Sequence, residues 1–339
     1  MKELNECIDE LRFRLAEGVK NVVIVPHISP DGDAVGACSA LAEVLSRVGI
    51  KWNILTCDRV PEYLRFLKHI PAAISNLDKP EECKQLSEKA DLIFMLDHNS
   101  ASREGDLECP VRDAKATRII IDHHPEPDMQ DIVISDTRVS STCELMYVVL
   151  TSIWGKEIIT ADIANSLYAG ISTDTGGLSH NSSHPETYRI IAALLEAGLN
   201  KEFVHKHIYQ MNNLSRLRLI GNTLLNKLQV DERYPVAIMP ITKEELEKYD
   251  YKDGDLEGLV NIPLSVHNID VSIQITERKD RIKLSFRSKG NVPVNAWAKA
   301  WFNGGGHINA AGGQMDSTLE EVIRKVQETM PLFFYEYVK

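Results

Sequence analysis

The sequence predicts an α/β protein with a doubly wound, mainly parallel sheet, joined by a helical linker to a smaller mixed α/β domain. The chain has 339 residues, about twice the length usual for one domain. Its first half alternates short apolar runs with helical patterns, as a parallel sheet with crossover helices requires. Its last third carries alternating runs separated by charged turn residues, which is typical of antiparallel strands.

Five apolar runs in the first half are bounded by polar loops, and such continuous runs suit strands that are buried on both faces. We predict strands at 22–25, 52–55, 92–96, 118–121 and 132–134. The segment between the first two has apolar residues at helical spacing, with Asp33 as the predicted N-cap and Gly49 as its end. Further helices are predicted at 143–153, 161–172 and 185–197.

The remaining chain divides into a connector and a second domain. The stretch 201–228 is helical in pattern, and the later runs YPVAIMPIT, VSIQITER and RIKLSFRS predict strands, the last two as a hairpin. We therefore expect a first domain at 1–190, a helical linker at 191–229 and a second domain at 230–339.

Composition limits the classes of function. There are 38 Lys and Arg against 49 Asp and Glu, a net charge of −11, which argues against a protein that coats long nucleic acid. The six cysteines form no C-x-x-C pair, the N-terminus lacks the apolar character of a signal peptide, and no apolar run reaches the roughly 18 residues of a membrane span. We expect a cytoplasmic enzyme or binding protein with no membrane partner.

Acids and imidazoles follow three of the predicted strands directly. His27, Asp31 and Asp33 follow the first, Asp97 follows the third, and Asp122, His123 and His124 follow the fourth. Any one of them could be a turn former or a helix cap. Because the carboxyl ends of parallel strands meet at one edge, where open α/β sheets bind ligands, the set together predicts a metal site.

A fourth element is ISTDTGGLS, in which Asp174 ends a helical stretch before two glycines. A carboxylate is disfavoured at that end of a helix, so we expect a positive charge beside it. Carboxylate and imidazole ligands without thiolates favour Mn²⁺ or Mg²⁺ over a structural zinc. Several clustered carboxylates need compensating charge, and two divalent ions would supply both that charge and phosphate ester hydrolysis.

The segment GGGHINAAGG, residues 304–313, is the second concentration of unusual residues. Gly304, Gly305 and Gly306 could cradle an anion with their backbone N–H groups, with His307 as a side-chain donor. The alternative is a glycine-rich turn that closes a helix against a sheet. In the preceding SFRS strand, Arg287 and Ser288 are further candidate phosphate donors.

These motifs resemble, in the same order, the four motifs of the DHH phosphoesterase superfamily: HISPDGD, the Asp of MLDHNS, the IDHH run and the Asp of STDTGG. GGGHINAAGG with SFRS resembles the DHH-associated C-terminal domain. The size and two-domain plan are most similar to the bacterial nano-RNase (oligoribonuclease) and 3′-phosphoadenosine 5′-phosphate phosphatase group. The resemblance covers nearly the whole chain.

The resemblance implies two divalent ions, Mn²⁺ before Mg²⁺, in two ligand sets that share Asp97. The first set is His27, Asp31 and Asp97; the second is Asp33, Asp97, His123 and Asp174. It also implies that Asp122 orients the imidazoles and that His124 stabilises or protonates the leaving group. Arg103, Arg287, Ser288, Gly304 to Gly306 and His307 would contact the substrate; a surface role is the alternative for Arg103.

The activity implied is attack by a metal-bridged hydroxide on a phosphate of di- to penta-nucleotides, giving mononucleotides, or of 3′-phosphoadenosine 5′-phosphate, giving AMP. The partners are then short RNA or small nucleotides rather than long duplexes, and a homodimer fits the resemblance. The nearest alternative is a phosphodiesterase of cyclic dinucleotides such as c-di-AMP. A catalytically silent nucleotide sensor is a further alternative, although all expected ligands are present. Family II inorganic pyrophosphatase ranks lower because its second-domain signature is missing.

Overall fold

The computed structural model describes residues 4–128, 130–211, 213–252 and 254–338. They form two compact units, Met1–Met211 and Asn212–Lys339, each built around a six-stranded sheet. The boundary lies inside the predicted linker. Helix α8 (Lys201–Tyr209) packs on α6 (Ala161–Asp174) of the first unit, and Leu219 of α9 (Leu214–Asn222) is buried in the second.

The first sheet is parallel throughout, in the order β3-β2-β1-β4-β5-β6. Its strands are β1 (Asn21–Pro26), β2 (Lys51–Thr56), β3 (Ile74–Ser75), β4 (Leu92–Leu96), β5 (Thr117–Asp122) and β6 (Ile132–Ser135). All five predicted strands are present, and β3 is an addition too short for a pattern to reveal. The strand order reverses between β1 and β4, which is the point at which doubly wound sheets bind ligands.

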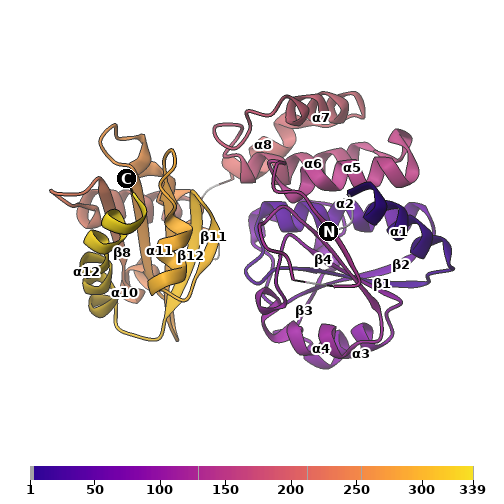
Figure 1. Ribbon diagram of the computed structural model, residues 1–339, viewed down its shortest axis with the longest axis horizontal. Coiled ribbons are helices and arrows are strands. Elements are labelled where there is room, and N and C mark those ends of the chain that lie inside the picture. The colour runs from indigo at the N-terminus through magenta and orange to yellow at the C-terminus, as the bar shows by residue number, and fades with distance from the viewer. Residues whose placement is uncertain (1–3, 129, 212, 253, 339) are drawn as a thin grey trace. The chain divides into compact units, whose positions relative to one another are not determined.

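Helices cover both faces of this sheet (Figure 1). Along β1, Val22 and Ile24 belong to one buried cluster, and Val23 and Val25 belong to another on the opposite face. The first cluster includes residues of α1 (Leu4–Ala16), α2 (Gly32–Arg47), α5 (Thr142–Trp154), α6 (Ala161–Asp174) and α7 (Pro185–Glu196). The second lies under α3 (Pro80–Glu88) and α4 (Glu108–Asp113). Burial on both faces explains the unbroken apolar runs of the strands.

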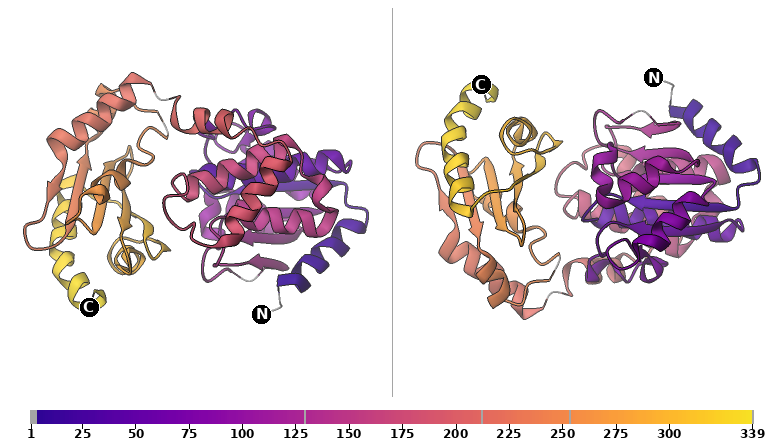
Figure 2. Two further views of the ribbon diagram at one scale, coloured as in Figure 1. Left: turned by 90° about the horizontal axis from the view of Figure 1, so that it is seen from above. Right: turned by 90° about the horizontal axis from the view of Figure 1, so that it is seen from below.

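The second sheet has the order β11-β12-β10-β9-β8-β7, with β8 and β9 parallel and the other pairs antiparallel. Its strands are β7 (Gln229–Val230), β8 (Val236–Ile241), β9 (Val271–Glu277), β10 (Ile282–Ser288), β11 (Gly305–His307) and β12 (Ala310–Met315). The predicted hairpin is β9 with β10. Helix α12 (Leu319–Tyr337) runs along one face of this sheet (Figure 2).

The remaining elements complete the second unit. Helix α11 (Val294–Trp301) shares the apolar cluster of α12, centred on Trp297, Phe286 and Phe333. On the opposite face, α10 (Lys243–Lys248), the π-helical segment Thr223–Lys227 and the 3₁₀ segment Leu259–Ser265 pack over β8 and its neighbours β9 and β10. Among the described residues, no helix combines the length and the apolar character needed to cross a membrane.

Candidate metal centre

The loop after β1 places three potential ligands at the switch point of the first sheet. His27 follows the strand, and Asp31 caps α2 by accepting hydrogen bonds at Oδ1 from the backbone N–H groups of Asp33 (3.0 Å) and Ala34 (3.2 Å). The prediction of Asp33 as N-cap is therefore wrong by two residues, since the helix begins at Gly32. Capping uses one oxygen of Asp31, and its Oδ2 lies 3.7 Å from Nε2 of His27.

Asp97 follows the adjacent strand β4 in a left-handed backbone conformation, with φ of 60°. That conformation is costly for a residue with a Cβ atom, and such strain concentrates at functional sites. The residue is 2% exposed. Its Oδ2 lies 3.6 Å from Nε2 of His27, which completes a first group of His27, Asp31 and Asp97.

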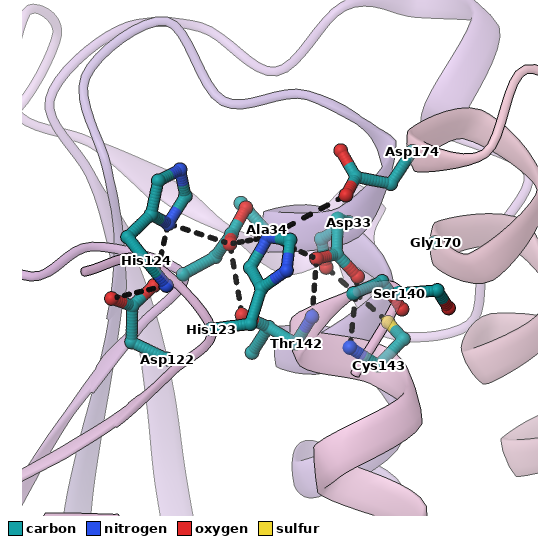
Figure 3. A network of polar contacts seen from close by, with 12 residues as sticks. Asp33, Ala34, Asp122, His123, His124, Ser140, Thr142, Cys143, Gly170 and Asp174 are labelled. Atoms are coloured by element: carbon teal, nitrogen blue, oxygen red, sulfur yellow. Dashed lines mark hydrogen bonds and ion pairs between the residues drawn. The ribbon is translucent and has the colours of Figure 1, made fainter. Parts of the chain in front are cut away.

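A second group forms around Nε2 of His123, the residue after β5. This nitrogen lies 3.7 Å from Oδ1 of Asp97, 3.9 Å from Oδ2 of Asp33 and 3.5 Å from Oδ2 of Asp174 (Figure 3). Asp174 is the last residue of α6, where a carboxylate is disfavoured by the helix dipole. His123 lies beside it and can stabilise it, either as a charged imidazole or as a ligand of the same ion. Asp97 therefore presents one oxygen to each group.

The two groups fit divalent ions by geometry and by donor type. Metal to ligand distances of about 2.1 Å allow two ligands of one ion to lie up to about 4.2 Å apart. The separations of 3.5 to 3.9 Å fall below that limit and are too long for hydrogen bonds. Oxygen and imidazole donors suit Mn²⁺ or Mg²⁺. The centre thus holds two adjoining candidate sites that share Asp97.

The protein groups of the centre compensate one another's charge poorly. Burial raises the pKa of Asp33 well above its usual value, and the carboxylates of Asp97 and Asp174 raise it further. Burial lowers the pKa of His27, but Asp31 and Asp97 more than offset it, and the net value is about 9. The surplus of carboxylates thus draws protons into the centre, a role that divalent cations would take over.

Asp122 and His124 form a hydrogen-bonded pair that adjoins the two groups, with Nδ1 of His124 3.7 Å from Oδ1 of Asp97. Asp122 is the last residue of β5, and its Oδ1 lies 2.7 Å from Nδ1 of His124. Nε2 of His124 lies 3.4 Å from Nη1 of Arg103, which belongs to the 3₁₀ segment Ala101–Leu107. The structure thus brings Arg103, which is half-buried, to the predicted leaving-group residue.

Two residues of the centre carry no signal in the sequence. The N-terminal turn of α5 donates the backbone N–H of Thr142 to Oδ2 of Asp33 (2.6 Å) and that of Cys143 to Oδ1 (2.8 Å). The Thr142 hydroxyl donates to Oδ1 of Asp97 (2.9 Å). The run SST before an apolar stretch predicts that a helix starts there. It does not reveal which residues the start of the helix contacts.

In the second unit, Arg287 and Ser288 point to opposite faces of the sheet, because successive residues of a strand alternate. Ser288 is buried, donates its hydroxyl hydrogen to the carbonyl of Val292 (2.6 Å) and accepts from Asn309 (2.9 Å). It has no hydrogen left for a phosphate, and its predicted pairing with Arg287 as a phosphate donor is not supported. Arg287 on β10 pairs with Ala310 on β12, and Ala310 pairs with His307 on β11. The three side chains therefore share one face of the sheet.

The glycine-rich segment is an edge hairpin, β11 with β12, rather than a loop. A Cβ on Gly304 would lie 1.9 Å from the carbonyl oxygen of Gly312, and one on Gly306 would lie 2.5 Å from that of Ala310. Close strand packing therefore explains these two glycines without any anion. Gly305 is exposed and has open space at its Cβ position, so close strand packing does not explain this glycine.

Comparisons with known proteins identify the family of both units. The chain matches the DHH family, N-terminal domain, over residues 21–171 and the DHHA1 domain over residues 233–332. It is 27% identical over 300 residues to the bifunctional oligoribonuclease and PAP phosphatase NrnA of Bacillus subtilis, covering 87% of this chain and 90% of that protein. The NrnA of Thermus thermophilus is 29% identical over 318 residues, with 91% and 90% covered.

A solved structure extends the similarity to the whole chain. The crystal structure of an exopolyphosphatase-related protein from Bacteroides fragilis matches with a TM-score of 0.90 and 34% identity, covering 98% of this chain and 99% of that one. The expected fold and family are thus confirmed. With both domain models matched in order, this chain belongs to the DHH family of phosphoesterases that carry a DHHA1 domain.

Proposed function

We propose that this protein hydrolyses short oligoribonucleotides to mononucleotides, 3′-phosphoadenosine 5′-phosphate to AMP, or both, with two Mn²⁺ ions. The observation that carries the proposal is the pair of adjoining ligand groups that share Asp97, whose two oxygens face different imidazoles. Two divalent ions bound there supply a hydroxide nucleophile and neutralise the phosphoryl oxygens. The names of the relatives that align over most of both chains point to the substrate class.

Three residues beside the ligand groups, Asp122, His124 and Arg103, have proposed roles in proton transfer and phosphate binding. Asp122 accepts the Nδ1 proton of His124, which leaves Nε2 as the reactive atom of the ring. Nε2 faces Arg103, a guanidinium suited to phosphate. In the proposed reaction Arg103 binds the scissile phosphate, and His124, protonated on both ring nitrogens, gives its Nε2 proton to the leaving oxygen and returns to the Nδ1–H form.

The second unit offers a surface for the rest of the substrate. Arg287, Ala310 and His307 lie side by side on one sheet face, and Gly312 and Gly305 occupy the next row of that face. The small residues between Arg287 and His307 leave a flat surface, which can accommodate a nucleoside that carries a phosphate. We propose Arg287, His307 and the Gly305 backbone as substrate contacts and omit Ser288.

One assay panel tests the function. The purified chain with Mn²⁺ is offered a 5′-phosphorylated dinucleotide, 3′-phosphoadenosine 5′-phosphate, a cyclic dinucleotide, pyrophosphate, inorganic polyphosphate and a long single-stranded RNA. We expect turnover of the first two and little of the rest. Preference for the cyclic dinucleotide would establish the alternative, and preference for long RNA would contradict the length limit.

Metal and assembly are tested in the same preparation. Activity after chelation should return with Mn²⁺ more fully than with Mg²⁺, whereas binding of nucleotide without any turnover would favour the silent sensor. The expected homodimer is checked by light scattering of the full chain.

A further inference from the structure

The first turn of α5 contacts two of the proposed metal ligands (Figure 3). The backbone N–H of Thr142 and the hydroxyl of the same residue reach different carboxylates, Oδ2 of Asp33 at 2.6 Å and Oδ1 of Asp97 at 2.9 Å. One residue therefore ties the carboxylate that follows β4 to one in the first turn of α2.

The two oxygens that Thr142 contacts belong to the same ligand group. Oδ2 of Asp33 and Oδ1 of Asp97 are the atoms that lie 3.9 and 3.7 Å from Nε2 of His123. The other oxygen of Asp97, Oδ2, faces His27 in the first group. The Thr142 hydroxyl thus contacts only the oxygen of Asp97 that faces the second group.

Thr142 is itself held firmly. It is fully buried, and its β-branched side chain has few rotamers. Ser141 caps the helix by accepting from the N–H of Glu144 (3.0 Å), and the buried Glu144 carboxylate accepts from the N–H of Ser140 (3.1 Å) and the hydroxyl of Thr187 (2.9 Å). The hydroxyl of Thr142 therefore has a fixed direction.

We propose that Thr142 is a positioning residue that sets the orientation of the Asp97 carboxylate, so that Oδ1 serves the second ion while Oδ2 serves the first. This inference rests on the proposed two-ion centre. It assigns to Thr142 an effect on one of the two ion sites and not on the other. The hydrogen bond occupies one lone pair of Oδ1 and leaves another for a metal. Such outer partners of metal ligands commonly matter by 10-fold to 100-fold in affinity.

The test is a Mn²⁺ titration followed by the electron paramagnetic resonance signal of free Mn²⁺, with thermal unfolding of the metal-free protein measured alongside. Thr142→Val removes the hydroxyl at nearly constant shape, and Thr142→Ser retains it. The matched control is Thr151→Val on the same helix, because the Thr151 hydroxyl donates to the backbone carbonyl of Tyr147 (2.8 Å). Asp31→Asn and Asp174→Asn identify which binding phase belongs to which group.

Asp174→Asn should remove one of the two binding phases. We expect Thr142→Val to lower the Mn²⁺ affinity of that same phase by 10-fold to 100-fold and that of the other phase less than threefold. Thr142→Ser and Thr151→Val should bind both ions like the unchanged chain. If Thr142→Val is unfolded without metal, Thr142→Ala repeats the titration, since it places no methyl group against the carboxylate.

Three outcomes would overturn the inference. Both ions bound normally by Thr142→Val would remove any positioning role, and equal weakening of both phases would make the role merely structural. An unchanged chain that takes up fewer than two ions would refute the two-ion centre itself, a failure that differs visibly from the first two.

Discussion

Nδ1 of His124 lies 2.7 Å from Oδ1 of Asp122, and the backbone N–H of His124 donates to Oδ2 of the same carboxylate at 3.0 Å. Both oxygens of a fully buried acid are thus used to fix one imidazole. The contact keeps a proton on Nδ1, so Nε2 is the ring nitrogen that takes up a proton and passes it on.

His124→Ala should lower kcat by roughly 10²-fold to 10⁴-fold, the usual contribution of general acid catalysis. Asp122→Asn should lower it less, because the ring stays in place but can take the wrong tautomer. Mn²⁺ content should be unchanged in both variants. A loss of bound metal in His124→Ala would instead make His124 a ligand.

Asp97→Ala should abolish turnover, because each of the two proposed sites loses a ligand. Metal analysis of the purified variant is the measurement, and we expect both ions to bind more weakly. Asp31→Asn is the matched comparison, since Asp31 faces only the first group. Retained activity in Asp97→Ala would refute the shared-ligand arrangement.

The sequence predicted most of the parallel sheet because burial on both faces leaves unbroken apolar runs, and it predicted the ligand residues because they follow those runs. The structure brings His27, Asp31, Asp33, Asp97, His123 and Asp174 into two adjoining groups. Their roles in metal binding stay predictions until ions are measured.

What the sequence could not reveal depends on partners far along the chain. Thr142 reaches Asp33 across 109 positions, and no spacing rule links them. The hairpin of β11 and β12 was missed because glycines have low strand propensity and give no period. The predicted strand RIKLSFRS already contained Arg287 and Ser288, and the alternation of side chains along a strand separates these two residues.

Binding of Mn²⁺ should release protons at pH 7. The pKa of His27 is about 9 in the metal-free protein, above its ordinary value, so the ring is protonated at neutral pH and must lose that proton to bind a metal. Apparent affinity should therefore rise with pH up to about 9, by at most tenfold per unit for each proton released. Calorimetry in two buffers of different protonation enthalpy gives the number, and equal heats in both would contradict it.

The last prediction separates the two neighbours on β10. Arg287→Ala should raise KM at least tenfold with little change in stability, because the guanidinium lies on the proposed substrate face and is only half-buried. Ser288→Ala should leave KM within about twofold and destabilise the second unit by about 1 kcal/mol, since Val292 and Asn309 each lose a hydrogen-bond partner. Steady-state kinetics and urea unfolding distinguish them. A KM effect of Ser288→Ala equal to that of Arg287→Ala would mean that substrate binding rearranges the end of β10, because one flat strand cannot direct both side chains to the same ligand.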